Sequence, residues 1–235
     1  MRRLLAPSAL VVALAALTVG AAPIGAANDC DGLMVCVPVA GPWVVVPTGS
    51  AVPRPRAEYQ LTCPRRYVVG GLDAELSHRA IDVGFLGMLG SPVNPGITTS
   101  RSAVFFGSFV GRSARAPSFR PHIGCMPAAG GGVRVPTAVA AFPPGRPTLR
   151  RVRTVRVRPG SATVAQACRA GERLVGASHA VGFFTRRPPS ESLAASVGTT
   201  QAVRDGRVVV TVRGDAELGG VHAVVQVHAV CARPS

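Results

Sequence analysis

The chain has 235 residues, of which 47% are hydrophobic, and carries 26 basic residues, 11 acidic residues and a formal net charge of +15. The hydrophobic fraction is enough for one or two ordinary cores. Aromatic residues make up only 5% of the chain, too few for a base-stacking surface, so nucleic acid is not expected as a partner. Every basic residue is Arg, which suggests a GC-rich coding sequence but does not explain the excess of basic over acidic residues.

Residues 1–27 have the features of a signal peptide. Arg2 and Arg3 precede an apolar stretch over residues 10–19, and small residues lead to Ala27, after which we expect cleavage. Without cleavage the same segment would be a membrane anchor, and the sequence leaves that alternative open. No later stretch is long and apolar enough to span a bilayer, so the mature chain is expected to be secreted and extracytoplasmic.

All six cysteines follow the predicted signal peptide, and an even number of cysteines in a secreted chain predicts disulfides. The spacing from Cys63 to Cys125 is one residue shorter than that from Cys168 to Cys231, and a similar Val/Gly phrase follows the first cysteine of each pair. We interpret this agreement as an internal duplication. The predicted disulfides are Cys30–Cys36, Cys63–Cys125 and Cys168–Cys231. No Cys-x-x-Cys is present, so a metal site is not expected.

Strand patterns are frequent and helix patterns are few. They favour an all-β fold of two tandem β-sandwich-like modules from an internal duplication, each with one disulfide. The expected parts are a signal peptide (1–27), a short N-terminal disulfide loop (28–36), β-module 1 (37–126), a Gly/Pro-rich linker (127–149) and β-module 2 (150–235). The sequence leaves open whether the modules share one core.

The expected strands, in chain order, are 59–63, 67–71, 81–89, 103–110, 151–158, 163–168, 173–184, 196–204 and 221–231. The last alternates strictly, which predicts a half-buried strand with His222, Gln226 and His228 on its second face. Asp205-Gly206 predicts a type I′ hairpin turn. A slip in the alternation between Thr154 and Val155 predicts a bulge.

Candidate catalytic groups are few. The phrase at 176–180, Gly-Ala-Ser-His-Ala, resembles a nucleophile elbow but lacks the final Gly, so a plain strand is expected. Asp73 with Glu75, and Asp215 with Glu217, are candidate carboxylate pairs for glycan hydrolysis, although solvated carboxylates are commoner. Arg-Gly-Asp at 213–215 is attributed to a turn. The five histidines are expected at the surface or with satisfied hydrogen bonds, and no catalytic residue, metal or cofactor is predicted.

Arginines crowd one predicted strand, 150–158, and one predicted loop that contains Arg112, Arg115 and Arg120. Such charge attracts anionic polymers. Charged residues on an edge strand also prevent aggregation between sheets, which is the alternative interpretation. The first interpretation predicts anion binding at Arg151, Arg153, Arg156 and Arg158.

The segments that begin at Cys63-Pro64 and at Cys168 resemble uncharacterised secreted proteins of GC-rich bacteria, which repeat a Cys-Pro-x-Gly…Val-x-Gly β-module. The resemblance implies export and the β-module, and it implies no catalytic residue. The chain departs from the pattern because Arg66 stands in place of Gly and Arg169 in place of Pro.

These observations predict an exported, non-enzymatic protein that is a structural or binding component at the cell envelope. Its expected partner is an anionic envelope polymer or another extracellular protein. Two alternatives remain open: an extracellular glycan hydrolase, and a secreted protein-binding or inhibitor module that uses loops 91–100 and 186–192.

Overall fold

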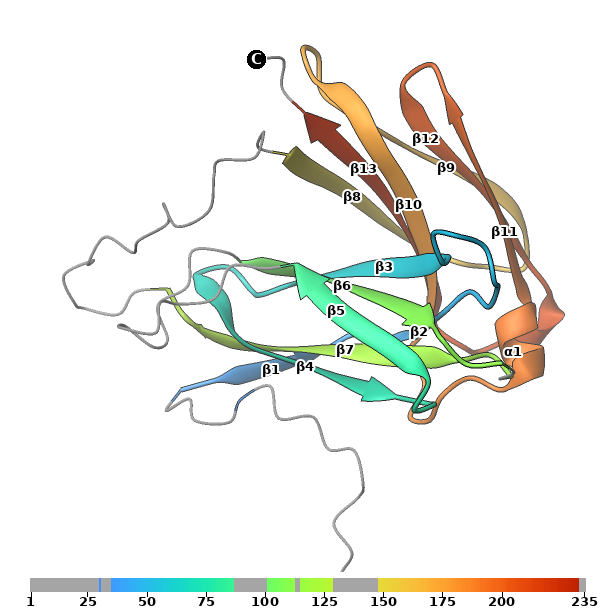
Figure 1. The fold of residues 1–235 in the computed structure, drawn as a ribbon, viewed down its shortest axis with the longest axis horizontal. Helices are drawn as coiled ribbons and strands as arrows, with labels where there is room; N and C mark the ends of the chain where they lie inside the picture. The colour runs from blue at the N-terminus through green and yellow to red at the C-terminus, as the bar shows by residue number, and fades with distance from the viewer. Residues whose placement is uncertain (1–29, 31–34, 87–100, 113–114, 129–147, 233–235) are drawn as a thin grey trace, which may run out of the picture.

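The computed structural model describes residues 30, 35–86, 101–112, 115–128 and 148–232. The predicted signal peptide, loop 91–100 and most of the predicted linker lie outside these residues. The described part is all-β, as predicted, with short helices α1 (Glu191–Ala195) and η2 (Ala216–Leu218) (Figure 1). None of its helices combines the length and apolar character needed to cross a membrane.

A large sheet runs through both halves of the chain in the order β1-β7-β2-β10-β13-β8, and β4 pairs with the other edge of β7 (Figure 1). Its strands are β1 (Val37–Ala40), β2 (Trp43–Val45), β4 (Tyr67–Leu76), β7 (Ser118–Pro127), β8 (Thr148–Arg156), β10 (Arg173–Phe183) and β13 (Ala223–Ala232). Val44 of β2 pairs with Phe119 of β7 on one side and with Gly182 of β10 on the other. The short strand β2 therefore joins the two halves into one sheet.

Two smaller sheets cover the large one. The first has the order β3-β6-β5, formed by β3 (Arg56–Thr62), β5 (Ile81–Leu86) and β6 (Ser102–Phe109). The second pairs β11 (Val197–Arg204) with β12 (Arg207–Gly214), and β9 (Gly160–Ala167) lies beside β12. Each smaller sheet encloses a separate hydrophobic core against the large sheet.

The first core contains Phe105, Phe119 and Ile123, and the second contains Phe183 and a run of buried valines on β12 and β13. The sequence alone left open whether the halves share a core; the structure contains two clusters. The boundary is not sharp, because Ala180 and Val224 from the second half belong to the first core.

Disulfides join Cys30 to Cys36, Cys63 to Cys125 and Cys168 to Cys231, the same pairs that the spacing predicts. Cys63 directly follows β3 and Cys125 lies on β7, while Cys168 directly follows β9 and Cys231 lies on β13. Each of the two long-range disulfides therefore ties a smaller sheet to the large sheet.

Pro121 lies inside β7, which has neighbours on both edges. Proline has no N–H for a sheet hydrogen bond, so it is normally confined to edges and bulges. The carbonyl of Pro121 accepts from Gly41 N, at the break between β1 and β2. The N and C=O of one strand residue point to the same edge of the strand. The N–H that Pro121 lacks would therefore have faced the break between β1 and β2.

The predicted hairpin at Asp205-Gly206 is confirmed. Both residues have positive φ, 48° and 67°, and Arg204 pairs with Arg207 across the turn. The residues on either side form β11 and β12 in unbroken register. Only the predicted local turn chemistry is needed to explain this element.

The predicted bulge between Thr154 and Val155 is wrong, because β8 pairs with β13 without any shift in register. The apolar alternation changes phase in the sequence because both faces of β8 are in use. Thr154 lies on the face that accepts a hydrogen bond from Gln226, and Val155 lies against the second core. Register shifts occur instead between Val69 and Gly71 on β4 and between Leu174 and Gly176 on β10.

The prediction that the last strand is half-buried is also wrong. Val225, Val227 and Cys231 of β13 lie in the second core, as the pattern predicted. The opposite face is buried as well, and Gln226 and His228 are among its buried residues. Strand β3, from the first half of the chain, lies over that face: its Gln60 N donates to Gln226, and its Glu58 accepts from Arg150 of the neighbouring β8.

Candidate functional site

A buried group of polar side chains, here called the inter-half cluster, lies where β3 meets the large sheet. It consists of Glu58 on β3, Arg150 on β8, Ser178 on β10 and His228 on β13. Ser178 Oγ donates to Glu58 Oε2 over 2.8 Å, and Arg150 donates to the same oxygen. Arg150 NH1 also lies 2.9 Å from His228 Nδ1. These contacts connect four strands from both halves of the chain.

The alternation of β3 explains why Glu58 occupies this position. Ala57, Tyr59 and Leu61 point into the first core, so the residues between them must point to the other face. There Glu58 enters the inter-half cluster and Gln60 meets Gln226. The Gln60 backbone N donates to Gln226 Oε1 over 2.6 Å, and Gln226 Nε2 donates to Gln60 O over 3.1 Å. The side-chain amide of Gln226 thus pairs with a strand backbone as another strand would.

The electrostatics of the cluster are strongly perturbed. Burial raises the pKa of Glu58, but hydrogen bonds and charge from Arg150, with Ser178 and Arg56, outweigh it and leave the pKa below its ordinary value. Burial, with a smaller contribution from the Arg150 charge, lowers the pKa of His228 to about 3. His228 is therefore neutral, and its Nδ1 accepts from Arg150. Its Nε2 is buried and has no hydrogen-bond partner among the described residues.

His228 predicts a loss of stability in mild acid. Its folded pKa of about 3 lies below the ordinary 6.5, so its contribution is fully present above pH 6.5 and is lost as pH falls toward 3. Between about pH 7 and about pH 5 the unfolding free energy should decrease by about 2 kcal/mol, because only the unfolded imidazole takes a proton. Urea denaturation at both pH values measures this. His228→Asn should flatten the dependence, whereas the exposed His222→Gln should not; an unchanged slope in His228→Asn contradicts the assignment.

The segment 176–180 is part of β10, as the strand interpretation predicted, and not a nucleophile elbow. Ser178 and His179 are consecutive in a strand and point to opposite faces. Ser178 donates to Glu58, whereas His179 lies 2.8 Å from both Gln201 Oε1 and Thr199 Oγ1 on β11. The two side chains therefore do not form a nucleophile–base pair.

The candidate carboxylate pairs are engaged in other contacts. Glu75 Oε1 lies 2.9 Å from His122 Nε2 and 3.9 Å from Arg120 NH1. Asp215 accepts from the backbone N of Glu217 over 2.9 Å and thereby caps η2. One carboxylate of each candidate pair is therefore engaged within the fold. Arg120 also lies in β7 and not in the predicted arginine loop.

The four arginines predicted to bind anions do not form one surface. Arg151 and Arg153 lie on one face of β8, Arg156 lies on the other, and Arg158 follows the strand. Arg151 is paired with Glu172 and Arg153 reaches the carbonyl of Ala165. Arg156 and Arg158 line a small hollow of about 180 Å³. The alternation of the strand is the physical reason for this separation.

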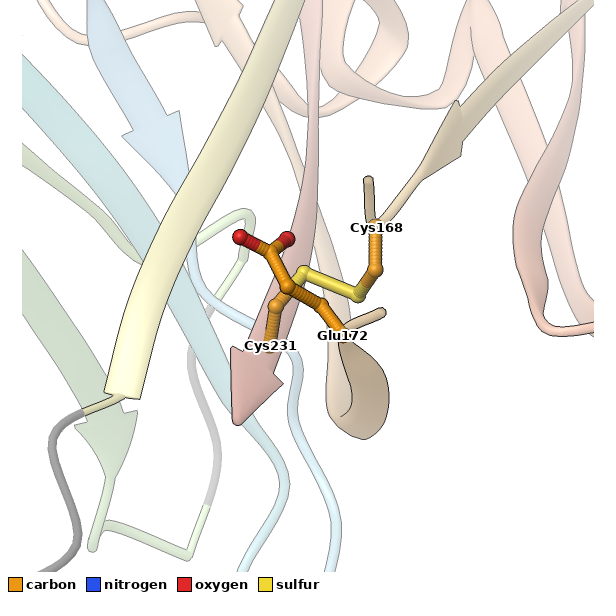
Figure 2. A group of neighbouring side chains, drawn as sticks. All are labelled: Cys168, Glu172 and Cys231. Carbon is orange, nitrogen blue, oxygen red and sulfur yellow. A yellow bond between two sulfur atoms is a disulfide. The ribbon is translucent and has the colours of Figure 1, made fainter. Parts of the chain in front are cut away.

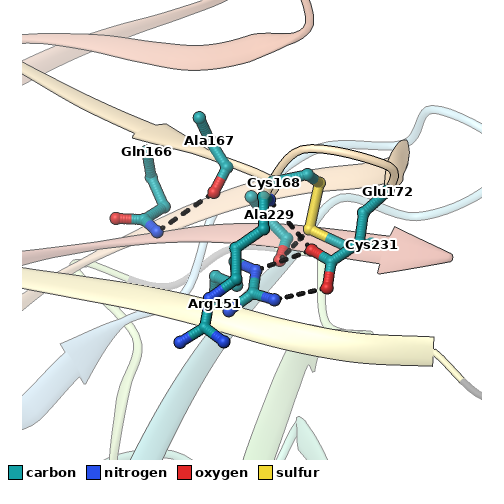
Figure 3. Close-up of a disulfide and its surroundings, with 8 residues drawn as sticks. Arg151, Gln166, Ala167, Cys168, Glu172, Ala229 and Cys231 are labelled. Atoms are coloured by element: carbon teal, nitrogen blue, oxygen red, sulfur yellow. Dashed lines mark hydrogen bonds and ion pairs between the residues drawn. A yellow bond between two sulfur atoms is a disulfide. The ribbon is translucent and has the colours of Figure 1, made fainter. Parts of the chain in front are cut away.

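Cys168, Glu172 and Cys231 offer ligand atoms within 4.8 Å of one another, close enough to suggest a metal site (Figure 2). The two sulfurs are joined as a disulfide, so neither is a thiolate ligand. Glu172 accepts from Arg151 (Figure 3). It also accepts from the backbone N of Arg169. These hydrogen bonds, that of Arg151 first, lower the pKa of Glu172 to about 2. The group is a structural ion pair beside a disulfide.

A surface hollow of about 610 Å³, here called the Arg-lined hollow, lies between the β2–β3 and β6–β7 connections. Thr48, Ser50, Arg54 and Arg112 line it, and all four are exposed. No acidic side chain is among the described residues that line it. The sequence placed Arg112 in an arginine-rich loop but did not single out Thr48, Ser50 or Arg54, since nothing local relates residues that lie so far apart in the chain.

No protein-family model matches the chain, and a search of curated proteins finds no relative.

Proposed function

We propose that this protein is an exported, non-enzymatic binding component of the cell envelope, and that it holds anionic polymers in the Arg-lined hollow. The observation that carries this proposal is the composition of the hollow. Two arginines and two hydroxyl-bearing residues line it, and its described lining contains no acidic side chain. Guanidinium and hydroxyl donors suit phosphate, sulfate and carboxylate oxygens.

The distribution of charge supports the same function. Glu58, Glu75 and Glu172 lie against arginines within the fold, so these acidic groups are occupied internally. Without Arg2 and Arg3 of the predicted signal peptide, a formal net charge of +13 remains of the +15 of the full chain, and much of this excess positive charge lies on the surface. Such a surface attracts polyanions over about 8 Å at physiological ionic strength.

Binding of labelled inorganic polyphosphate, measured by fluorescence anisotropy across a salt series, tests this proposal. We expect measurable affinity at low salt that falls as salt rises. Replacing both arginines, by Arg54→Gln with Arg112→Gln, should weaken binding by about tenfold or more, because charge-assisted hydrogen bonds are lost.

The matched control is Arg204→Gln with Arg207→Gln. These exposed arginines flank the hairpin turn and do not line the hollow. Both double variants remove the same charge, so only the loss of a specific site distinguishes them. Equal weakening by both would show diffuse attraction and would overturn the proposed site. The absence of binding by the unchanged protein at low salt would overturn the function.

The proposal includes export and an internal duplication. Three disulfides suit an oxidising compartment. Support for the duplication comes from register: Val69 pairs with Cys125 just before one bulge, and Leu174 pairs with Cys231 just before the other. Each half then carries its own long-range disulfide. The likeness to repeated β-modules of secreted bacterial proteins stays a prediction.

The glycan-hydrolase alternative has weaker support, since Glu75 and Asp215 are engaged in the contacts described above.

A further inference from the structure

One edge of β10 is largely unpaired within the described residues. β13 pairs along the whole of β10, but β2 pairs with it only at Gly182 and Phe183. β2 ends at Val45, and the N–H of the next residue, Val46, faces β7 and donates to Pro117 O. Pro47, which follows, has no N–H to offer. By alternation Pro47 is the next residue to face β10, so the pairing of β2 with β10 has no donor beyond Val45.

The alternation of the strand identifies which backbone groups this edge exposes. Phe184 N donates to His222 O on the β13 side. Backbone groups alternate between the two edges, so those of Ala177, His179 and Val181 point to the open edge. A side-chain contact reaches this edge: Gln201 Nε2 lies 3.5 Å from Ala177 O, a long distance that an incoming N–H can replace.

This open edge borders a hollow of about 430 Å³, here called the edge slot. β3 contributes one wall through Arg56 and Ala57, and β11 with α1 contributes the other through Ala194, Val197 and Thr199. The volume is within the range of ordinary ligand sites, about 300–1,000 Å³. The edge slot therefore lies beside the unpaired edge of β10, where an added strand would run.

We propose that the edge slot binds an extended peptide segment of another extracellular protein as an added strand beside β10. Only a polypeptide presents donors and acceptors at the repeat that Ala177, His179 and Val181 require. The walls are rich in small residues, so they accommodate short apolar side chains. Arg56 in the described lining lies 2.7 Å from Glu58, but the lining itself contains no acidic residue and the chain is strongly basic, so charge complementarity favours an acidic residue in the bound segment.

Amide hydrogen exchange measured by NMR tests this proposal, with the acetylated and amidated pentapeptide Glu-Ala-Val-Ala-Val as the probe. In the free protein the amides of His179 and Val181 should exchange faster than those of Ser178 and Ala180, which face β13. Saturating peptide should slow His179 and Val181 on the order of tenfold or more and leave the other two unchanged. Slow exchange of all four amides in the free protein, or no change with peptide, would overturn the proposal.

N-methylation of the probe separates strand addition from general apolar binding. Two probes are compared, one methylated at the odd-numbered amides of the peptide and one at the even-numbered amides. One of them should fail to bind and the other should bind as before, because only one of these two sets of N–H groups faces β10. Equal effects of the two methylation patterns on binding would contradict strand addition.

A variant that fills the slot provides a second measurement. Ala194→Trp should abolish binding, whereas Ala195→Trp, on an exposed neighbouring residue outside the lining, should not. Retained peptide binding in a folded Ala194→Trp variant would overturn the assigned location. The edge slot and the Arg-lined hollow share no lining residue, so polyphosphate binding reports on the proposed function independently of this result.

Discussion

Replacing Glu58 by Ala is expected to lower the free energy of unfolding by about 3–5 kcal/mol, since removal of one partner leaves a buried charge uncompensated. The side chains of Glu58 and Arg150 are 6% and 16% exposed. Arg150 would retain only the neutral His228 as a described side-chain partner. Ser178 would lose its acceptor on Glu58 as well. Urea denaturation at neutral pH, followed by circular dichroism, measures the change.

The matched control is Glu191→Ala. Glu191 also faces an arginine, Arg115, but the pair is 3.6 Å apart and its side chains are 66% and 88% exposed. Its removal should change stability by no more than about 0.5 kcal/mol. A double variant, Glu58→Leu with Arg150→Met, should recover much of the loss because no buried charge remains. If Glu58→Ala and Glu191→Ala had equal effects, the inter-half cluster would have no special role in stability.

Removal of the Cys63–Cys125 disulfide, by replacing both residues with Ala, is expected to cost about 4 kcal/mol. The link closes a loop of 62 residues, and closing so long a loop removes considerable entropy from the unfolded chain. The Cys168–Cys231 disulfide, with a separation of 63 residues, should have a similar effect. Chemical denaturation under non-reducing conditions measures both.

The Cys30–Cys36 disulfide is the internal comparison for these variants. Its separation is only 6 residues, so its removal should cost about half as much, on the order of 2 kcal/mol. A larger loss from this short link than from either long link would contradict the loop-entropy explanation.

The elements predicted from sequence are those whose signals are local. The β11–β12 hairpin follows from Asp205-Gly206, and β13 follows from strict alternation. Strands β1, β2 and β7 and helix α1 were not predicted. β2 has only three residues, and β7 contains Pro121, which normally argues against an inner strand. Its position opposite the gap between β1 and β2 is a tertiary fact that no local pattern contains.

The inter-half cluster was not predictable for a related reason. Glu58 and Gln60 alternate with apolar residues, as do Gln226 and His228, so each polar set resembles a solvent-facing side of a strand. In the structure the two polar sides face each other, and Gln60 bonds Gln226 across 166 positions in the chain. A pattern read one strand at a time cannot show that two polar faces are mutually complementary.

The position of β2 between β7 and β10 prevents the two halves of the chain from being separated without loss of contacts. Trp43–Val45 hydrogen-bonds to β7 and to β10, and β3 buries the polar face of β13. A fragment that holds only the second half would lose the strand that pairs with the end of β10. It would also lose Gln60, which bonds Gln226, and Glu58, the acidic partner of Arg150. The sequence shows two similar segments, each bounded by cysteines. Neither segment can be exchanged or expressed alone without loss of these contacts, so the two halves evolve and can be engineered only together.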